Sequence, residues 1–259
     1  MSLSITWLGH STVVLDMDRT RLLTDPLLRR HAGILRRRGP KPDRLAWEHT
    51  DAVLLSHLHH DHAELRSLRL LPAGVPVITA PENARWLNLR NLHGVSTRDD
   101  EWLAVGNGSG VTVTLCRADH SARPMPHRPN HANGHLVRSA STTVWVAGDT
   151  SLFADLSALP RTAGGPIDLA IVPVSGWGPR LSGGHLGPVE AAEACARVGA
   201  RHAVPVHWGT LHTPGGQVYP PGWMDRPGPA FVQALADRAP ACVPLLLERG
   251  VTAVVGGPA

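Results

Sequence analysis

The strongest constraint on this chain is one short stretch, Ser56-His57-Leu58-His59-His60-Asp61-His62. Its metal-binding side chains are His57, His59, Asp61 and His62. The stretch follows an apolar run at residues 52–55, which predicts a buried strand. A strand that ends in such a cluster delivers ligands to the edge of a sheet, where both solvent and substrate can reach a metal ion.

The spacing of these ligands favours two metal ions over one. A single tetrahedral ion rarely takes all four of its ligands from one tight loop. In such a loop His57 and His59 can point to one side, while Asp61 and His62 point to another. Imidazole and carboxylate ligands without a thiolate suit zinc, manganese or iron in a hydrolytic role. The alternative is a polar loop with coincidental histidines, which the chain's 16 histidines make easier.

The composition is that of a globular protein. The chain has 259 residues, of which 42% are hydrophobic and 18% are charged, enough to bury a large core. We find neither a short internal repeat nor a linker, so we expect a single domain over residues 1–259. No apolar run is long enough for a membrane span, and no export signal is visible. Three scattered cysteines fit a reducing compartment, which predicts a cytoplasmic protein. The oligomeric state stays open.

The net charge is +4, with an isoelectric point near 9.6, which raises the question of nucleic-acid binding. Aromatic residues make up only 4% of the chain and do not alternate with arginines, so nucleic acid is disfavoured as a partner. Much of the positive charge lies in a long connection at residues 27–50, with its basic residues within 27–44. This connection is either a solvated loop or a flap that steers an anionic substrate.

Strand and helix patterns follow one another along the chain. Strands are predicted at 3–8, 12–15, 22–23, 52–55, 75–79, 111–115, 142–146, 168–172, 203–206, 243–247 and 251–255. Helices are predicted at 63–71, 82–89, 188–198 and 231–239, the first of them capped by Asp61. Two runs of strands with interspersed helices favour a two-layered sheet core that helices flank.

Three further predicted strands end in possible ligands. His120 follows the strand at 111–115, Asp149 follows 142–146, and His207 follows 203–206. Together with the first motif, four strand ends can therefore converge on one rim of the sheets. Residues 121–133 form a proline-rich loop, which could be a lid, and this loop contains His127 and His131. These two histidines are better explained as exposed loop residues than as ligands.

The ordered set of possible ligands resembles the metallo-β-lactamase superfamily. The residues that carry the resemblance are His57-x-His59-x-Asp61-His62, His120, Gly148-Asp149 and His207. The resemblance covers essentially the whole chain and implies an α/β (α+β) fold, the four-layer αββα sandwich, with a dinuclear metal site. It implies that one ion is held by His57, His59 and His120, the other by Asp61, His62 and His207, with Asp149 bridging them. Flavodiiron oxygen reductases of this fold have a carboxylate at the position of His59, so an imidazole there favours hydrolysis.

Other segments are similar to one branch of that superfamily, which includes the ascorbate-6-phosphate lactonase and the N-acyl-phosphatidylethanolamine phospholipase D. These segments are residues 7–12, 24–26, 148–150, 185–191 and 205–210. The similarity implies that His185 contacts a substrate phosphate and that His10 supports the site from behind the ligands.

These observations predict a dinuclear hydrolase that acts on a small anionic or phosphorylated substrate. Two divalent ions, zinc first and manganese or iron as alternatives, would share a bridging hydroxide as the nucleophile. Asp61 could orient the nucleophile or relay a proton, and His185 could stabilise developing negative charge. Phosphodiester cleavage and lactone opening are both left open. The alternatives are a nuclease of the same fold and a non-catalytic, metal-stabilised binding protein.

Overall fold

The computed structural model describes residues 3–98, 101–106, 108–120 and 127–256. Within them the strands form two seven-stranded sheets and one three-stranded sheet. The order in the first sheet is β17 (Thr252–Val255), β1 (Leu3–Gly9), β2 (Thr12–Met17), β3 (Thr20–Thr24), β6 (Ala52–Leu54), β7 (Val77–Ile78) and β8 (Gly94–Val95). The order in the second is β16 (Val243–Pro244), β14 (His202–Val206), β13 (Leu169–Pro173), β12 (Thr143–Val146), β11 (Asn133–Arg138), β10 (Val111–Arg117) and β9 (Leu103–Val105). The third contains β15 (Leu211–His212), β5 (Leu35–Arg37) and β4 (His31–Ala32).

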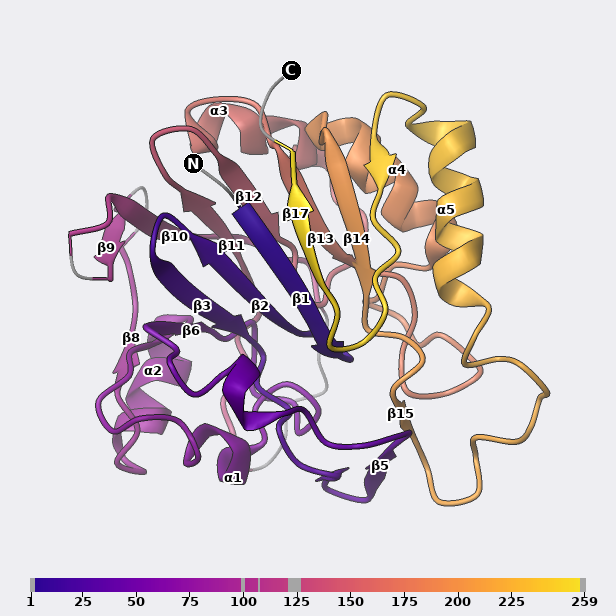
Figure 1. Ribbon diagram of the computed structural model, residues 1–259, viewed down its shortest axis with the longest axis horizontal. Helices are drawn as coiled ribbons and strands as arrows, with labels where there is room; N and C mark the ends of the chain where they lie inside the picture. The colour runs from indigo at the N-terminus through magenta and orange to yellow at the C-terminus, as the bar shows by residue number, and fades with distance from the viewer. Residues whose placement is uncertain (1–2, 99–100, 107, 121–126, 257–259) are drawn as a thin grey trace.

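Helices cover the outer face of each large sheet (Figure 1). The first sheet is covered by α1 (Leu65–Leu68) and α2 (Pro81–Asn88). The second is covered by α3 (Leu159–Ala163), α4 (Pro188–Val198) and α5 (Pro227–Arg238). Two 3₁₀ helices, η1 (Arg44–Ala46) and η2 (Ala154–Ala158), lie in connections. In the described part of the chain, no helix has the length and apolarity that a bilayer span requires. The predicted four-layer αββα sandwich is confirmed.

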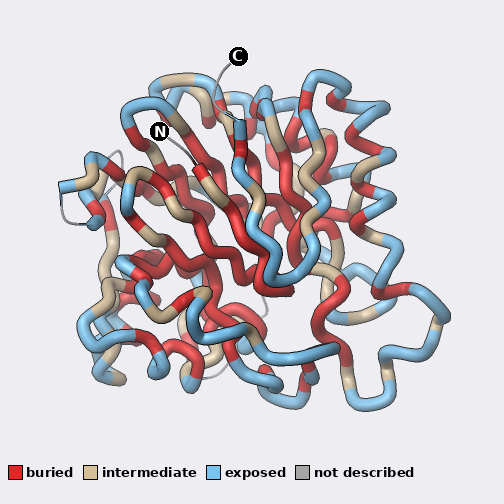
Figure 2. Tube along the Cα trace, viewed as in Figure 1, coloured by how far each residue is buried: buried red, intermediate tan, exposed pale blue. Residues whose placement is uncertain are grey.

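The apolar run at residues 52–55 is unbroken because β6 is buried on both faces. Ala52 and Leu54 pack between the two sheets, whereas Val53 and Leu55 pack against the helical layer. Figure 2 shows the buried chain concentrated in the two central layers, with exposed chain at the periphery. A strand that is buried on both faces has apolar residues at successive positions, whereas a half-buried strand alternates apolar and polar residues. This explains the unbroken apolar run in the sequence.

The strand directions bring several carboxyl ends together. In the first sheet β2 is antiparallel to β1 and to β3, while β6 is parallel to β3, so β1, β3 and β6 run the same way. In the second sheet β10, β12, β13 and β14 share one direction for the same reason. The segments that follow these strands therefore leave each sheet at a common edge.

Several local predictions differ from the structure: the strands predicted at 75–79 and 243–247 are only two residues long, and α3 and the short strands β4, β5, β8, β9 and β15 were not predicted. The helix predicted at 63–71 is only the short α1, and its N-terminus is capped by Glu64, whose side chain accepts from the amides of Arg66 and Ser67. Asp61 is not a cap. Strand β11 was not predicted, because its first residues, Asn133-Gly134, have the composition of a loop. Arg37, in the basic connection, is buried and donates to the carbonyl oxygens of Leu8 and Leu27.

Gly148, at the end of β12, provides a test of how tightly this edge is packed. Its φ is +65°, and a Cβ there would lie 2.7 Å from Ser56 Cβ and 2.9 Å from the carbonyl oxygen of Asn133. We expect Gly148→Ala to reduce the free energy of unfolding by about 2–5 kcal/mol, because a left-handed residue costs about 1–2 and overpacking about 1–3. Chemical denaturation measures this change. Gly165→Ala, with open space and no positive φ, is the control; an equal loss in both variants would contradict the prediction.

Candidate metal centre

Six strand ends deliver the polar residues of the site to one rim. His10 follows β1, Asp25 follows β3, and the ligand loop at residues 56–62 follows β6. From the second sheet, His120 follows β10, Asp149 follows β12 and His207 follows β14. Residues up to 200 positions apart are therefore in contact, as the hydrogen bond from the His10 amide to Thr210 Oγ1 shows.

A first group of ligand atoms contains only imidazoles. His57 Nε2 lies 2.8 Å from His59 Nδ1, and His120 Nε2 lies 3.4 Å from the same His59 atom. His57 is fully buried, whereas His59 and His120 are partly exposed. The three nitrogens are close enough to bind one ion together.

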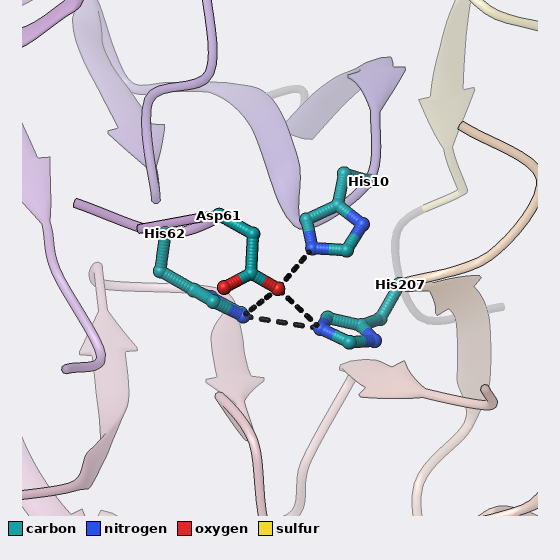
Figure 3. Close-up of side chains that lie close together, drawn as sticks. All are labelled: His10, Asp61, His62 and His207. Atoms are coloured by element: carbon teal, nitrogen blue, oxygen red, sulfur yellow. Dashed lines mark hydrogen bonds and ion pairs between the residues drawn. The ribbon is translucent and has the colours of Figure 1, made fainter. Parts of the chain in front are cut away.

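A second group combines imidazoles with a carboxylate (Figure 3). Asp61 Oδ2 lies 3.6 Å from His62 Nε2 and 3.5 Å from His207 Nε2, and these two nitrogens are 3.1 Å apart. His10 Nε2 contacts the same Asp61 oxygen at 3.0 Å. Its N–H donates to Asp61 and so fixes the position of the carboxylate.

Asp149 lies between the two groups. Its Oδ2 atom is 3.9 Å from His57 Nε2, 3.2 Å from His62 Nε2 and 3.3 Å from His207 Nε2. Its Oδ1 atom is buried and has no hydrogen-bond partner among the described residues. A buried carboxylate oxygen without a partner is costly in free energy, and a cation would satisfy it. The donor set and this oxygen therefore fit a divalent metal centre.

The outer nitrogens of four histidines are already bonded. His57 Nδ1 donates to Ser56 Oγ at 2.9 Å, and His62 Nδ1 donates to Asp25 Oδ2 at 2.7 Å. The acceptors for His120 and His207 are the carbonyl oxygens of Gly184 and Ser175, both at 2.7 Å. With Nδ1 bonded on the outer side, the Nε2 atom of each ring is directed to the cluster, which is how proteins orient metal-binding histidines.

Asp25 was not recognised as a supporting residue from the pattern of strands alone. It is 2% exposed and accepts hydrogen bonds from the amide and hydroxyl of Ser56 as well as from His62. A buried aspartate before a proline at a strand end was the available signal. Its partners lie about thirty residues downstream, so the sequence did not reveal them.

Burial controls the pKa values in the first group. It lowers the pKa of His57 well below its usual range and that of His59 to about 4, and it also lowers the pKa of His120. The three rings are therefore neutral at pH 7, as metal binding requires.

Carboxylates control the pKa values in the second group. Burial alone would lower the pKa of His207, but Asp149 and Asp61 outweigh it and raise the value to about 9. Asp149, Asp61 and Asp25 likewise raise the pKa of His62 well above its usual range, against the effect of burial. Without a cation, both rings hold their protons at pH 7.

An open cavity of about 780 Å³ gives access to the site. His59, His120 and Asp149 lie in its lining, together with His185. His185 Nε2 is 3.2 Å from Asp149 Oδ2, while its Nδ1 is 3.1 Å from Ser182 Oγ. The side chain thus lies beside both ligand groups, just before α4.

His127 and His131 lie outside these ligand groups. Both are exposed, and His131 is 3.8 Å from Glu82 instead. Residues 121–126, the first part of the predicted lid, are outside the described residues. His135 was not singled out in the sequence. It is fully buried on β11, and burial lowers its pKa to about 4.

The chain is similar to known proteins over most of its length. A family model described as a beta-lactamase superfamily domain matches residues 20–208. A UPF0173 metal-dependent hydrolase of Azorhizobium caulinodans is 30% identical over 219 residues, covering 81% of this chain and 86% of its own length. The N-acyl-phosphatidylethanolamine-hydrolyzing phospholipase D 1 of Caenorhabditis elegans is 29% identical over 79% of this chain, which spans 63% of that protein's length.

Solved structures share the fold at lower identity. Igni18, a metallo hydrolase from Ignicoccus hospitalis, superimposes with a TM-score of 0.73 at 18% identity over 98% of both chains. The isothiocyanate hydrolase from Delia radicum gut bacteria has a TM-score of 0.72 at 16% identity, over 98% of this chain and all of its own. At such identities the likeness concerns the fold.

The opposite pKa shifts predict unequal proton release when metal ions bind. At pH 7 an ion must displace the protons of His62 and His207, whereas His57, His59 and His120 have none to lose. We expect release of about two protons at the second group and about none at the first. Affinity at the second group should rise as the pH increases toward 9. Calorimetry in buffers of different ionisation enthalpy measures the count, which His207→Ala should lower by about one. Equal release at both steps would contradict the assignment.

Proposed function

The chain belongs to the β-lactamase superfamily, and from this membership and the geometry of the site we propose a dinuclear metal-dependent hydrolase that cleaves an ester bond in a small anionic substrate. The observation that carries the proposal is Asp149, a buried carboxylate between two ligand groups, one oxygen of which has no hydrogen-bond partner among the described residues. Phosphodiesters and lactones are the two substrate classes that we propose to test. The name of the nematode relative, a phospholipase D, supports the phosphodiester.

The proposed ligands are those of the two groups. One ion would be held by His57, His59 and His120, and the other by Asp61, His62 and His207, with Asp149 shared between them. Zinc is the first expectation, with manganese or iron as alternatives. Such a pair of ions lowers the pKa of a water molecule toward neutrality and polarises the substrate oxygen.

Asp61 would orient the attacking water. Burial alone would raise the pKa of Asp61, but His62, His10 and His207 outweigh it and keep the carboxyl ionised. The N–H of His10 holds the Oδ2 atom in place, and both side chains are buried. An ionised, immobile carboxylate can accept a hydrogen bond from a water molecule and thereby direct the lone pair of that water toward the substrate.

His185 would bind the anionic part of the substrate at the reacting bond. It lines the cavity, and its side chain retains 14% exposure beside Asp149. Its Nδ1 contacts Ser182 and the carbonyl oxygens of Ser182 and Gly183, which orients Nε2 toward the site. With Nδ1–H bonded to those oxygens, the imidazolium form of the ring can donate its Nε2–H to the substrate and stabilise negative charge that develops there.

The cavity wall suits a substrate that also has an apolar part. Ile34, at the tip of the β4–β5 hairpin, and Trp177 both line the cavity, and they are 76% and 46% exposed. Large apolar side chains that remain exposed beside a polar site provide binding area for a substrate's non-reacting portion.

Metal content and hydrolysis, measured on the same protein samples, test this function. We expect about two ions per chain by mass spectrometry, and hydrolysis of either bis(p-nitrophenyl) phosphate or a simple γ-lactone. His57→Ala and Asp149→Ala should lose metal and activity together. His185→Ala should keep its metal and lose about 100-fold in kcat, because it removes a single charge-stabilising donor.

Three outcomes would contradict the proposal. If Asp149→Ala binds as much metal as the wild-type protein, Asp149 is not a ligand that the two ions share. Loss of metal in His185→Ala would make His185 a ligand and not a substrate contact. A full complement of metal without hydrolysis of either ester would favour the non-catalytic binding protein.

A further inference from the structure

Two hollows follow the metal cavity along the surface beside α1. Gly33 and His60 line both the metal cavity and a neighbouring hollow of about 530 Å³. Arg29 and His31 line both that hollow and a third one of about 630 Å³. The hollow of about 530 Å³ therefore lies beside the metal cavity, and the hollow of about 630 Å³ lies beside it in turn; we call these two hollows together the basic groove.

The basic groove has an excess of positive charge. Its basic lining residues are Arg29, Arg30, Lys41, Arg44, Arg66, Arg69 and Arg128. Glu64 is the acidic residue that lines it, and that carboxylate already accepts from the amides of Arg66 and Ser67. Among the described residues, Arg44 has an ion-pair partner, Glu48, and the other six have none. Such a concentration of cations beside a catalytic cavity attracts an anion.

Arg128 supplies an independent reason to expect a ligand. Its side chain is only 8% exposed, and one guanidinium nitrogen, Nη1, donates to the carbonyl oxygens of Leu58 and Ala63 at 2.9 and 3.2 Å. Its buried Nε has no acceptor among the described residues. Burial, with repulsion from Arg90, lowers the pKa of Arg128. Glu64 offsets part of this shift, and the guanidinium lies 5.1 Å from the centre of the Trp86 ring, but no carboxylate of the described residues lies within ion-pair distance. An anion that binds beside such a buried charge would stabilise it.

We propose that the basic groove binds a second anionic group of the substrate, remote from the ester bond that is cleaved. This inference rests on the proposed function. The group would be a phosphate, sulfate or carboxylate, the oxyanions that arginine binds with two parallel hydrogen bonds. Arg128 forms the floor, and Arg66, Arg69 and Arg29 form the exposed rim.

The groove also assigns a role to the basic connection. Arg29, Arg30, Lys41 and Arg44 come from residues 27–44, and Gly33 and Ile34 of its hairpin reach the metal cavity. The connection thus borders the cavity at one end and the groove at the other. A substrate lying along it would place one anionic end at the metal centre and the other among the arginines.

A pair of substrates that differ in one distal charge tests the proposal. The first substrate is thymidine 5′-(p-nitrophenyl phosphate), which has one anionic group, at the ester bond. The second is the same ester with an added 3′-phosphate, which supplies the second anionic group. We expect wild-type protein to favour the 3′-phosphate ester, and the ratio of the two kcat/KM values to fall about fivefold in Arg66→Gln/Arg69→Gln. Both residues are exposed, so the fold should tolerate the change. Arg161→Gln/Arg238→Gln removes the same charge from α3 and α5 and should leave the ratio unchanged.

A binding measurement separates this proposal from the proposed function. Inorganic phosphate is titrated into metal-depleted Asp149→Ala protein and followed by ³¹P NMR. We expect binding that Arg66→Gln/Arg69→Gln weakens about fivefold and Arg161→Gln/Arg238→Gln does not. If neither ester is hydrolysed, the proposed function fails and this titration still decides about the groove. Equal phosphate binding in both double variants, or an unchanged substrate ratio, would overturn the proposal.

Discussion

The candidate site depends on one buried carboxylate outside the ligand set. The Asp25 carboxylate accepts hydrogen bonds from the amide and hydroxyl of Ser56, at 2.8 and 2.7 Å, and from Nδ1 of His62 at 2.7 Å. Its backbone adopts a φ of +34°, and its amide donates to Leu54 at the end of β6. A carboxyl group is expensive to bury, and three short hydrogen bonds offset that cost. The same hydrogen bonds hold the ligand loop against the end of β3, and they therefore fix the positions of the ligands before a metal ion binds.

The ligand groups themselves are unfavourable neighbours without a cation. Two imidazole nitrogens, on His62 and His207, face each other at 3.1 Å, and Asp149 has an oxygen with no partner among the described residues. The protein compensates in opposite ways on the two sides: burial keeps His57 neutral, whereas carboxylates keep His207 protonated. A fold that maintains such an arrangement against its own electrostatics gains stability when a metal ion binds.

Short-range patterns predicted much of this molecule, and contacts between distant residues account for what they missed. The strand ends at His57, His120, Asp149 and His207 were readable, because buried strands produce apolar runs and a polar residue must follow at the edge. The support that Asp25 gives to Ser56 and His62 was not readable, since those residues meet only through the pairing of β3 with β6. Likewise, an arginine-rich connection resembles a solvated loop until its partners are known. Asp61 was misassigned as a helix cap because α1 begins only at Leu65, with Glu64 as its cap, and the Asp61 carboxylate bonds to a distant residue, His10.

The central claim is that the two ligand groups form one centre that shares Asp149. Anomalous diffraction from a metal-loaded crystal, recorded at the absorption edge of the bound element, tests it most directly. The account predicts two peaks about 3.5–4 Å apart, one beside His57, His59 and His120, the other beside Asp61, His62 and His207, with Asp149 contacting both. A single peak at full loading, or two peaks with Asp149 bound to neither, would contradict it.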